Sequence, residues 1–259
     1  MTADPGQELV VDQETAVRTL GAAVERMVST QREAISAAAR LCAGALMADG
    51  ILQAFGTGHS QSFAMEIAGR AGGFAASNRL ALRQLVMAGA ATPEEIVNPE
   101  AERTVEYARR LWDLHDIRPA DVFLIASNSG GNATSVEMAL LAREHGNAVI
   151  AVTSLAHSSA ITSTHPSGKR LFEVADVVVD NCGVVGDSAV ELPGGVTVTP
   201  TSTVTSAYAA QMIATETCGL LLAAGHEVPV LTSVNVPEGK ARNERLKERY
   251  GSRVMENDP

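Results

Sequence analysis

The sequence predicts an α/β fold built on a parallel sheet, and three observations lead to that prediction. Short apolar runs of strand length alternate along the chain with longer amphipathic segments. Four such runs cover residues 51–55, 122–126, 148–153 and 175–179. The runs are apolar throughout rather than at every second residue, which is typical of strands buried on both faces. Strands that alternate with helices form a parallel sheet whose faces those helices cover.

The composition limits the classes of function. The chain has 259 residues, of which 46% are hydrophobic and 19% charged, so it can bury a substantial core. A formal net charge of −10, without a long basic run, argues against nucleic acid as the main partner. Aromatic residues make up only 3%, so stacking platforms are scarce. The three cysteines are widely spaced and form no CxxC pair, which argues against a zinc knuckle or a disulfide framework.

Neither a targeting segment nor a membrane span is apparent. The first fifteen residues are polar and acidic, without the charge and apolar core of a signal peptide. No apolar run approaches the roughly 20 residues of a membrane span. We therefore expect a cytoplasmic protein. We divide it into a flexible tail (1–12), a single domain (13–250, with N-terminal helices at 13–49) and a second tail (251–259).

The remaining elements are predicted from periodicity and turn signals. Residues 79–87 fit a short strand or a helix equally well. Helices are expected at 94–114, 133–144, about 203–222 and 239–250. A hairpin is expected at 189–199 and a last short strand at 228–234.

Small, hydroxyl-bearing and glycine-rich segments follow two of the predicted strands. The first turn (residues 56–62) reads GTGHSQS, and the second turn (residues 127–132) reads SNSGGN. Each lies between an apolar strand and a helix, where free backbone N–H groups and the helix dipole favour an anion. In an open parallel sheet such turns meet outside the carboxyl ends of the strands. We therefore predict a phosphate site there, to which the Ser/Thr cluster at residues 200–203 contributes.

Other phosphate-binding and catalytic patterns do not fit. The sequence contains neither a GxxxxGK[ST] P-loop nor a GxSxG nucleophile elbow. Gly56 and Gly58 match the first two glycines of a GxGxxG dinucleotide fingerprint, but Gln61 stands where the third is required.

The two turns resemble the signature loops of the SIS (sugar isomerase) family of phosphosugar-binding domains. The resemblance rests on residues 56–60 with 68–70 and on the second turn, and it extends to about residue 250. The single-domain phosphoheptose-isomerase-like group is most similar, and residues 165–169 (HPSGK) and 200–205 (PTSTVT) also look like that group. The resemblance implies a three-layer α/β/α sandwich around a five-stranded parallel sheet. It also implies a homodimer or homotetramer with phosphosugar sites near subunit interfaces.

Carried over by position, the resemblance assigns phosphate binding to both turns and to the start of the long C-terminal helix. The residues are Gly58, Ser60, Ser127, Asn128, Ser129, Gly130, Asn132, Ser202 and Thr203. Among them, Gly58, Asn128 and Gly130 shape the turns.

Aldose–ketose isomerisation requires a base whose pKa lies near the working pH. Glu66 follows Ser62 by four residues, so the two share a helical face. It resembles the carboxylate that phosphoheptose isomerases use as base. Glu216 is the second candidate, at a position where those enzymes carry a histidine. His59 could act as the acid in ring opening or contact the ligand, or it could have a structural role in the turn. Some phosphoheptose isomerases bind zinc through these helices, but Ser62 or Phe63 replaces their histidine, so we expect neither a metal nor a cofactor.

The leading prediction is therefore a sugar-phosphate isomerase that uses a carboxylate base. Two alternatives stay open: a non-catalytic phosphosugar sensor, and a lyase that removes an ether from an amino-sugar phosphate. The expected partners are a sugar phosphate and other copies of the chain, with no nucleic acid and no membrane.

Overall fold

The structure, a computed structural model, describes residues 11–255. Its centre is a five-stranded sheet in the order β2-β1-β3-β4-β5, in which all neighbouring strands are parallel. The strands are β1 (Leu52–Gly56), β2 (Ser77–Leu80), β3 (Val122–Ala126), β4 (Ala148–Thr153) and β5 (Val177–Asp180). Every residue of β1 and β3 is buried, as their uninterrupted apolar sequences predict.

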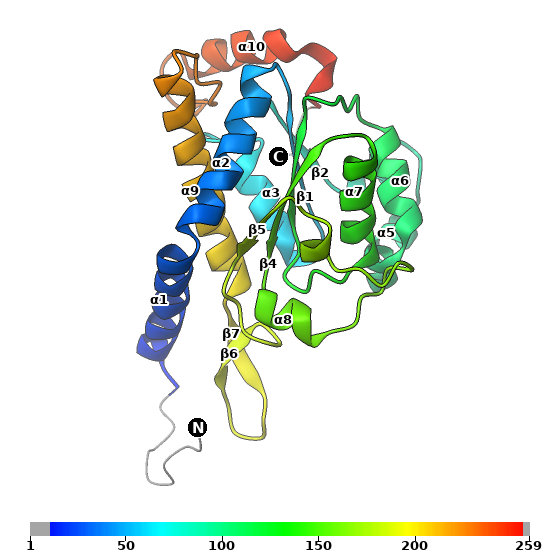
Figure 1. The fold of residues 1–259 in the computed structure, drawn as a ribbon, viewed down its shortest axis with the longest axis vertical. Coiled ribbons are helices and arrows are strands. Elements are labelled where there is room, and N and C mark those ends of the chain that lie inside the picture. Colours follow the sequence, from blue (N-terminus) through cyan, green and yellow to red (C-terminus); the bar gives the residue numbers. More distant parts are fainter. Residues whose placement is uncertain (1–10, 256–259) are drawn as a thin grey trace.

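Helices cover both faces of the sheet and complete the predicted three layers (Figure 1). One face packs against α2 (Arg32–Met47), α3 (Gln61–Ile67) and α9 (Ser202–Ala223), and the other against α4 (Arg83–Met87), α6 (Val105–Asp113) and α7 (Ala133–Glu144). The remaining helices are α1 (Gln13–Thr30), α5 (Pro93–Val97), α8 (Leu155–Ala160) and α10 (Gly239–Tyr250), with the short 3₁₀ turns η1 (Gly58–Ser60), η2 (Pro99–Arg103), η3 (Leu171–Glu173) and η4 (Gly251–Arg253).

The segment predicted as one helix over residues 94–114 is divided into α5, η2 and α6. Asn98 is extended, with φ −66° and ψ 128°, because the residue before a proline avoids the helical region. Its side chain accepts a hydrogen bond from the backbone N–H of Glu100 at 3.0 Å and so caps η2. The break turns η2 against α7 and brings its side chains toward the second turn.

The hairpin predicted at residues 189–199 is present as β6 (Ser188–Glu191) and β7 (Thr197–Pro200), which pair antiparallel. The undecided segment 79–87 divides into the end of β2 and α4. No strand forms at residues 228–234, where only an isolated bridge between Val230 and Phe74 is found. The expected tail at residues 1–12 lies outside the described residues except for Val11 and Asp12, and Asp12 caps α1.

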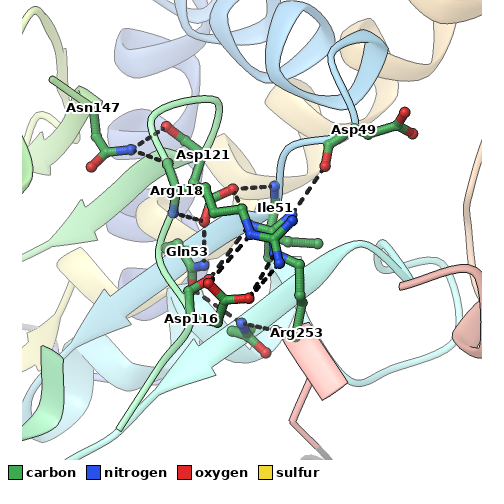
Figure 2. A network of polar contacts seen from close by, with 9 residues as sticks. Asp49, Ile51, Gln53, Asp116, Arg118, Asp121, Asn147 and Arg253 are labelled. Carbon is green, nitrogen blue, oxygen red and sulfur yellow. Dashed lines mark hydrogen bonds and ion pairs between the residues drawn. The ribbon is translucent and has the colours of Figure 1, made fainter. Parts of the chain in front are cut away.

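A buried polar network closes the edge of the sheet at which β1 and β3 begin (Figure 2). Asp121 accepts hydrogen bonds from the backbone N–H groups of Ile51 (2.9 Å) and Arg118 (3.1 Å). It also accepts from the side chains of Gln53 (3.0 Å) and Arg253 (2.7 Å). Residues 251–255, expected to form a tail, therefore contribute a cation that ties the C-terminal segment to the sheet.

The opposite edge contains the topological switch of the fold. From β1 the chain passes through α3 to β2 on one side, and it later returns to β3 on the other side of β1. Gly56 pairs with Ala126, so the first and second turns start side by side. Because α3 and α7 lie on opposite faces of the sheet, the two turns separate and leave a crevice between them.

Candidate functional site

A cavity of about 420 Å³ lies in this crevice, which we call the switch cavity. Its walls are the first turn, the second turn, Glu102 of η2, His157, and the base of the hairpin with the start of α9. The predicted site residues that line it are Gly58, His59, Ser60, Ser127, Asn128, Ser129, Asn132, Ser202 and Thr203. Gly130 lies behind this surface, and Glu66 and Glu216 do not line the cavity.

The second turn is held rigidly from behind. Gly130 has a φ of +62°, and a Cβ there would lie 2.5 Å from the hydroxyl oxygen of Ser158, so only glycine fits. Thr164 donates its hydroxyl to the carbonyl of Gly131 at 3.0 Å, and the backbone N–H of Ala133 donates to that hydroxyl at 3.1 Å. In the described chain, the backbone N–H groups of Asn128 and Ser129 find no acceptor. They are therefore available to a ligand.

The first turn is held by its own backbone. A Cβ at Gly56 would lie 2.5 Å from the carbonyl oxygen of Ser60, so the chain turns here only with glycine. Ser60 donates its backbone N–H to the carbonyl of Thr57 at 3.0 Å. Its hydroxyl has no partner among the described residues, and neither has the imidazole of His59. Both face the cavity with free hydrogen-bonding groups.

Glu102 joins the two turns and is a site residue that the sequence reasoning missed. Its Oε2 accepts hydrogen bonds from the hydroxyl of Thr57 at 2.9 Å and from the amide of Asn132 at 2.6 Å. Its own carbonyl accepts from the hydroxyl of Thr134 at 2.9 Å, which fixes η2 against α7. The only sequence signal for this placement is the proline at position 99, which interrupts the predicted helix three residues earlier.

A carboxylate of the chain already occupies the start of α9. Asp187, whose φ is 69°, accepts at Oδ1 from the backbone N–H groups of Ser202 (2.8 Å) and Thr201 (3.2 Å). Its Oδ2 accepts from the hydroxyl of Ser202 at 2.8 Å. Ser202 therefore lines the cavity as expected for a phosphate contact, but its hydroxyl and backbone N–H donate to Asp187 in this structure. Among the described residues, no lysine or arginine lines the switch cavity, so an anion there would depend on neutral donors.

Glu66 and Glu216 lie on a different surface, formed by α3 and α9. Glu66 forms an ion pair with Arg70 and accepts from the amide of Gln211 at 2.5 Å. Glu216 lies on the open side of α9 near Tyr208 and Gln211. Ser62 does not line the cavity either, so Glu66 and Ser62 share a helical face that points away from the switch cavity.

His165 belongs to a buried ion-pair network that supports the second turn. Its Nε2 lies 2.8 Å from Oε2 of Glu137, and Oε1 of Glu137 accepts from Arg109 at 2.6 Å. Burial raises the pKa of Glu137, but hydrogen bonds from His165 and Arg109 outweigh burial and hold that pKa below its usual value. Residues 163 and 164, just before His165, contact the second turn, so this network positions the turn rather than contacting the cavity.

The described residues contain neither a candidate metal centre nor a helix that could cross a membrane. Between residues 11 and 255, no cluster of three or more histidine, cysteine, aspartate and glutamate side chains is arranged to hold a metal ion. None of the helices in that range combines the length and apolar character that a membrane crossing requires.

The fold is that of a parallel α/β protein with a cavity at the switch in strand order. Residues 17–154 match the family model described as "SIS domain", and the chain belongs to this family. It is similar to a UPF0309 protein of Halalkalibacterium halodurans, with 37% identity over 85% of this chain and 90% of the relative. A UPF0309 protein of Listeria monocytogenes is 33% identical over 89% of this chain and 92% of the relative.

The solved structure of a phosphoheptose isomerase from Francisella tularensis has a similar fold. It matches with a TM-score of 0.54 and 13% sequence identity, over 79% of this chain and 95% of that one. At this identity the likeness shows the shared fold alone.

Proposed function

We propose that the protein binds a sugar phosphate in the switch cavity and interconverts its aldose and ketose forms. The observation that carries the proposal is the meeting of the two serine-lined turns at the switch in strand order. Backbone N–H groups of Asn128 and Ser129 and the hydroxyl of Ser60 are donors without a partner in the described chain, and these suit phosphate oxygens. The helix dipole of α7 supplies positive potential in place of basic side chains, because Asp187 already occupies the start of α9.

The charges of the cavity indicate how the substrate would lie. Glu102 and Asp187 are the acidic residues that line the cavity. A phosphate dianion would be repelled by both, so we place it against the second turn and Ser60, with the sugar hydroxyls toward the carboxylates. Hydroxyl groups of a sugar can donate to carboxylate oxygens, which a phosphate dianion cannot do.

Binding can be tested by thermal unfolding with a panel of sugar phosphates and the matching free sugars. A ligand at 100 times its Kd adds about 2.7 kcal/mol of stability. We expect stabilisation by one or more phosphates, weakened at least about tenfold in affinity by Ser60→Ala, which removes the free hydroxyl, since hydrogen bonds to charged groups contribute about 1.5–3 kcal/mol. Ser29→Ala is the matched control, because that hydroxyl bonds only to its own helix in α1. Stabilisation by free sugars but not by their phosphates would contradict the proposal.

Product analysis of the stabilising phosphates then separates the reaction classes. Interconversion of aldose and ketose supports the isomerase. Release of lactate from an amino-sugar phosphate ether would indicate the lyase, and binding without any turnover would indicate the sensor.

A further inference from the structure

The proposed isomerisation needs a base that reaches the sugar carbons within the switch cavity. Among the described residues, Glu102 and Asp187 are the carboxylates that line it. Both oxygens of Asp187 are already engaged by the start of α9, through the backbone and hydroxyl of Ser202 and the backbone of Thr201. A proton acceptor needs a free lone pair directed at the substrate, so Asp187 fits this role poorly.

The two oxygens of Glu102 have different surroundings. Oε2 is fixed by Thr57 of the first turn and by Asn132 at the start of α7. Oε1 lies beside Gly58, where a Cβ would be only 2.9 Å from it, and it has no hydrogen-bond donor in the described chain. One oxygen therefore orients the carboxylate, and the other is left free at the wall of the cavity.

In the described part of the chain, no cation is paired with the Glu102 carboxylate. By contrast, Glu66 forms an ion pair with Arg70, and Glu137 forms one with Arg109. The partners that the structure gives to the Glu102 side chain are a hydroxyl and an amide, both neutral. A base that must accept a proton from carbon needs an available lone pair within contact distance of the substrate, and Glu102 provides one.

We propose that Glu102, rather than Glu66, moves the proton between C2 and C1 of the sugar phosphate; this assignment depends on the proposed function. Oε1 takes the proton from C2, and the C2–H electron pair becomes the C1–C2 double bond while the carbonyl oxygen at C1 gains a proton. In the second half, the hydroxyl at C2 loses its proton and becomes a carbonyl. The double-bond electrons then take the proton of Glu102 at C1. No atom or electron is gained or lost, and no cofactor is required.

His59 lines the same cavity and has no partner in the described chain, so it can carry the proton from the C2 oxygen to the C1 oxygen. Such a shuttle suits imidazole, which both donates and accepts near neutral pH. Glu102 of η2 then moves the proton on carbon, and His59 of the first turn moves the proton on oxygen.

The test compares Glu102→Gln with Glu66→Gln, using turnover and the exchange of the C2 proton with deuterated water. Glutamine keeps an acceptor for Thr57 and Asn132 but is not a base, so we expect Glu102→Gln to lose turnover and exchange by about 10²–10⁴-fold. Thermal stabilisation by the sugar phosphate should remain. Glu66→Gln, the matched control, should stay within about threefold of the wild type in both measurements.

Glu102→Asp provides a second variant if Glu102→Gln does not fold. It keeps the charge but withdraws the carboxylate by one methylene group, so we expect slower exchange with binding retained. Exchange and turnover that survive Glu102→Gln but are lost in Glu66→Gln would overturn the assignment and leave the isomerase standing. A wild-type protein that exchanges no C2 proton with any stabilising phosphate would overturn both.

Discussion

The two edges of the central sheet are both rich in polar side chains, but they differ in how completely these are paired. At the edge where β1 and β3 begin, Asp121 is fully buried and accepts from four donors. At the edge where they end, the hydroxyl of Ser60, one oxygen of Glu102 and the backbone N–H groups of Asn128 and Ser129 have no partner in the described chain. The first edge is completed by the chain itself, whereas the second leaves polar groups available to a ligand.

The extent of hydrogen-bond pairing separates structural from functional polar groups on this sheet. Both edges combine acidic side chains with side-chain amides, so composition alone does not distinguish them. Pairing does, because a satisfied polar network contributes to folding, whereas unpaired groups around a cavity stay available for binding. The two edges should therefore respond to mutation in opposite ways.

The largest effect is expected for Asp121→Ala, at the paired edge. The variant removes the buried carboxylate that lies 2.7 Å from Arg253 and that accepts from the backbone N–H of Ile51, and breaking a buried pair in this way costs about 3–5 kcal/mol. Urea unfolding measures the loss. The stabilisation that a sugar phosphate adds should be unchanged, because Asp121 lies just before β3 begins and the cavity lies where β3 ends.

Asp116→Ala is the matched control, since Asp116 also pairs with arginine but is half exposed. It should cost no more than about 1 kcal/mol. Equal losses in the two variants would show that the buried network contributes no more than a surface pair.

His115 is an exception to this pattern. It is incompletely paired, but it does not line the switch cavity. Its Nε2 contacts Oε1 of Gln84 at 3.3 Å, while its Nδ1 is buried without a partner in the described chain. Burial lowers the pKa of His115 from 6.5 to about 4. As the pH falls, His115 therefore takes up a proton in the unfolded chain before it does so in the folded protein. The stability due to the neutral imidazole is present above pH 6.5 and is lost between pH 6.5 and about 4.

The size of this effect is on the order of 3 kcal/mol across the whole interval. Unfolding of the wild type and of His115→Gln should be measured from pH 7 to pH 4. We expect the difference in free energy of unfolding between the two proteins to change by that amount, because only the wild type carries this titration. A difference that is independent of pH would contradict a buried neutral imidazole.

Much of the fold could be predicted from the sequence. The four apolar runs, the hairpin and the helix at 239–250 are present, because each depends on local pattern and on burial. The strand β2 could not be identified, since its sequence, Ser-Asn-Arg-Leu, is mostly polar. It is buried because Asn78 pairs with Gln53 of β1 and with the carbonyl of Arg253, contacts that no local pattern reveals.

The candidate site was predictable in its turns but not in its acids. The turns follow strands directly, so sheet topology brings them together. Glu66 shares a face with Ser62 as the helical period requires, but Ser62 bonds to the carbonyl of His59 and faces away from the cavity. Glu102 reaches the cavity only because Pro99 breaks a helix and η2 packs on α7, which is a tertiary effect.

The smallest effect is expected for Asp187→Asn, at the edge of the sheet where β1 and β3 end. Asparagine tolerates the left-handed backbone at this position and still accepts from Ser202, but it removes the charge. The loss of stability should stay below about 1 kcal/mol, the usual size of a charge–dipole interaction at a helix start. Because a negative charge leaves the cavity wall, the stabilisation by orthophosphate at fixed ionic strength should increase. Glu191→Gln on the same hairpin, outside the cavity, should leave that stabilisation unchanged, and an equal response in both variants would show that Asp187 does not face the bound anion.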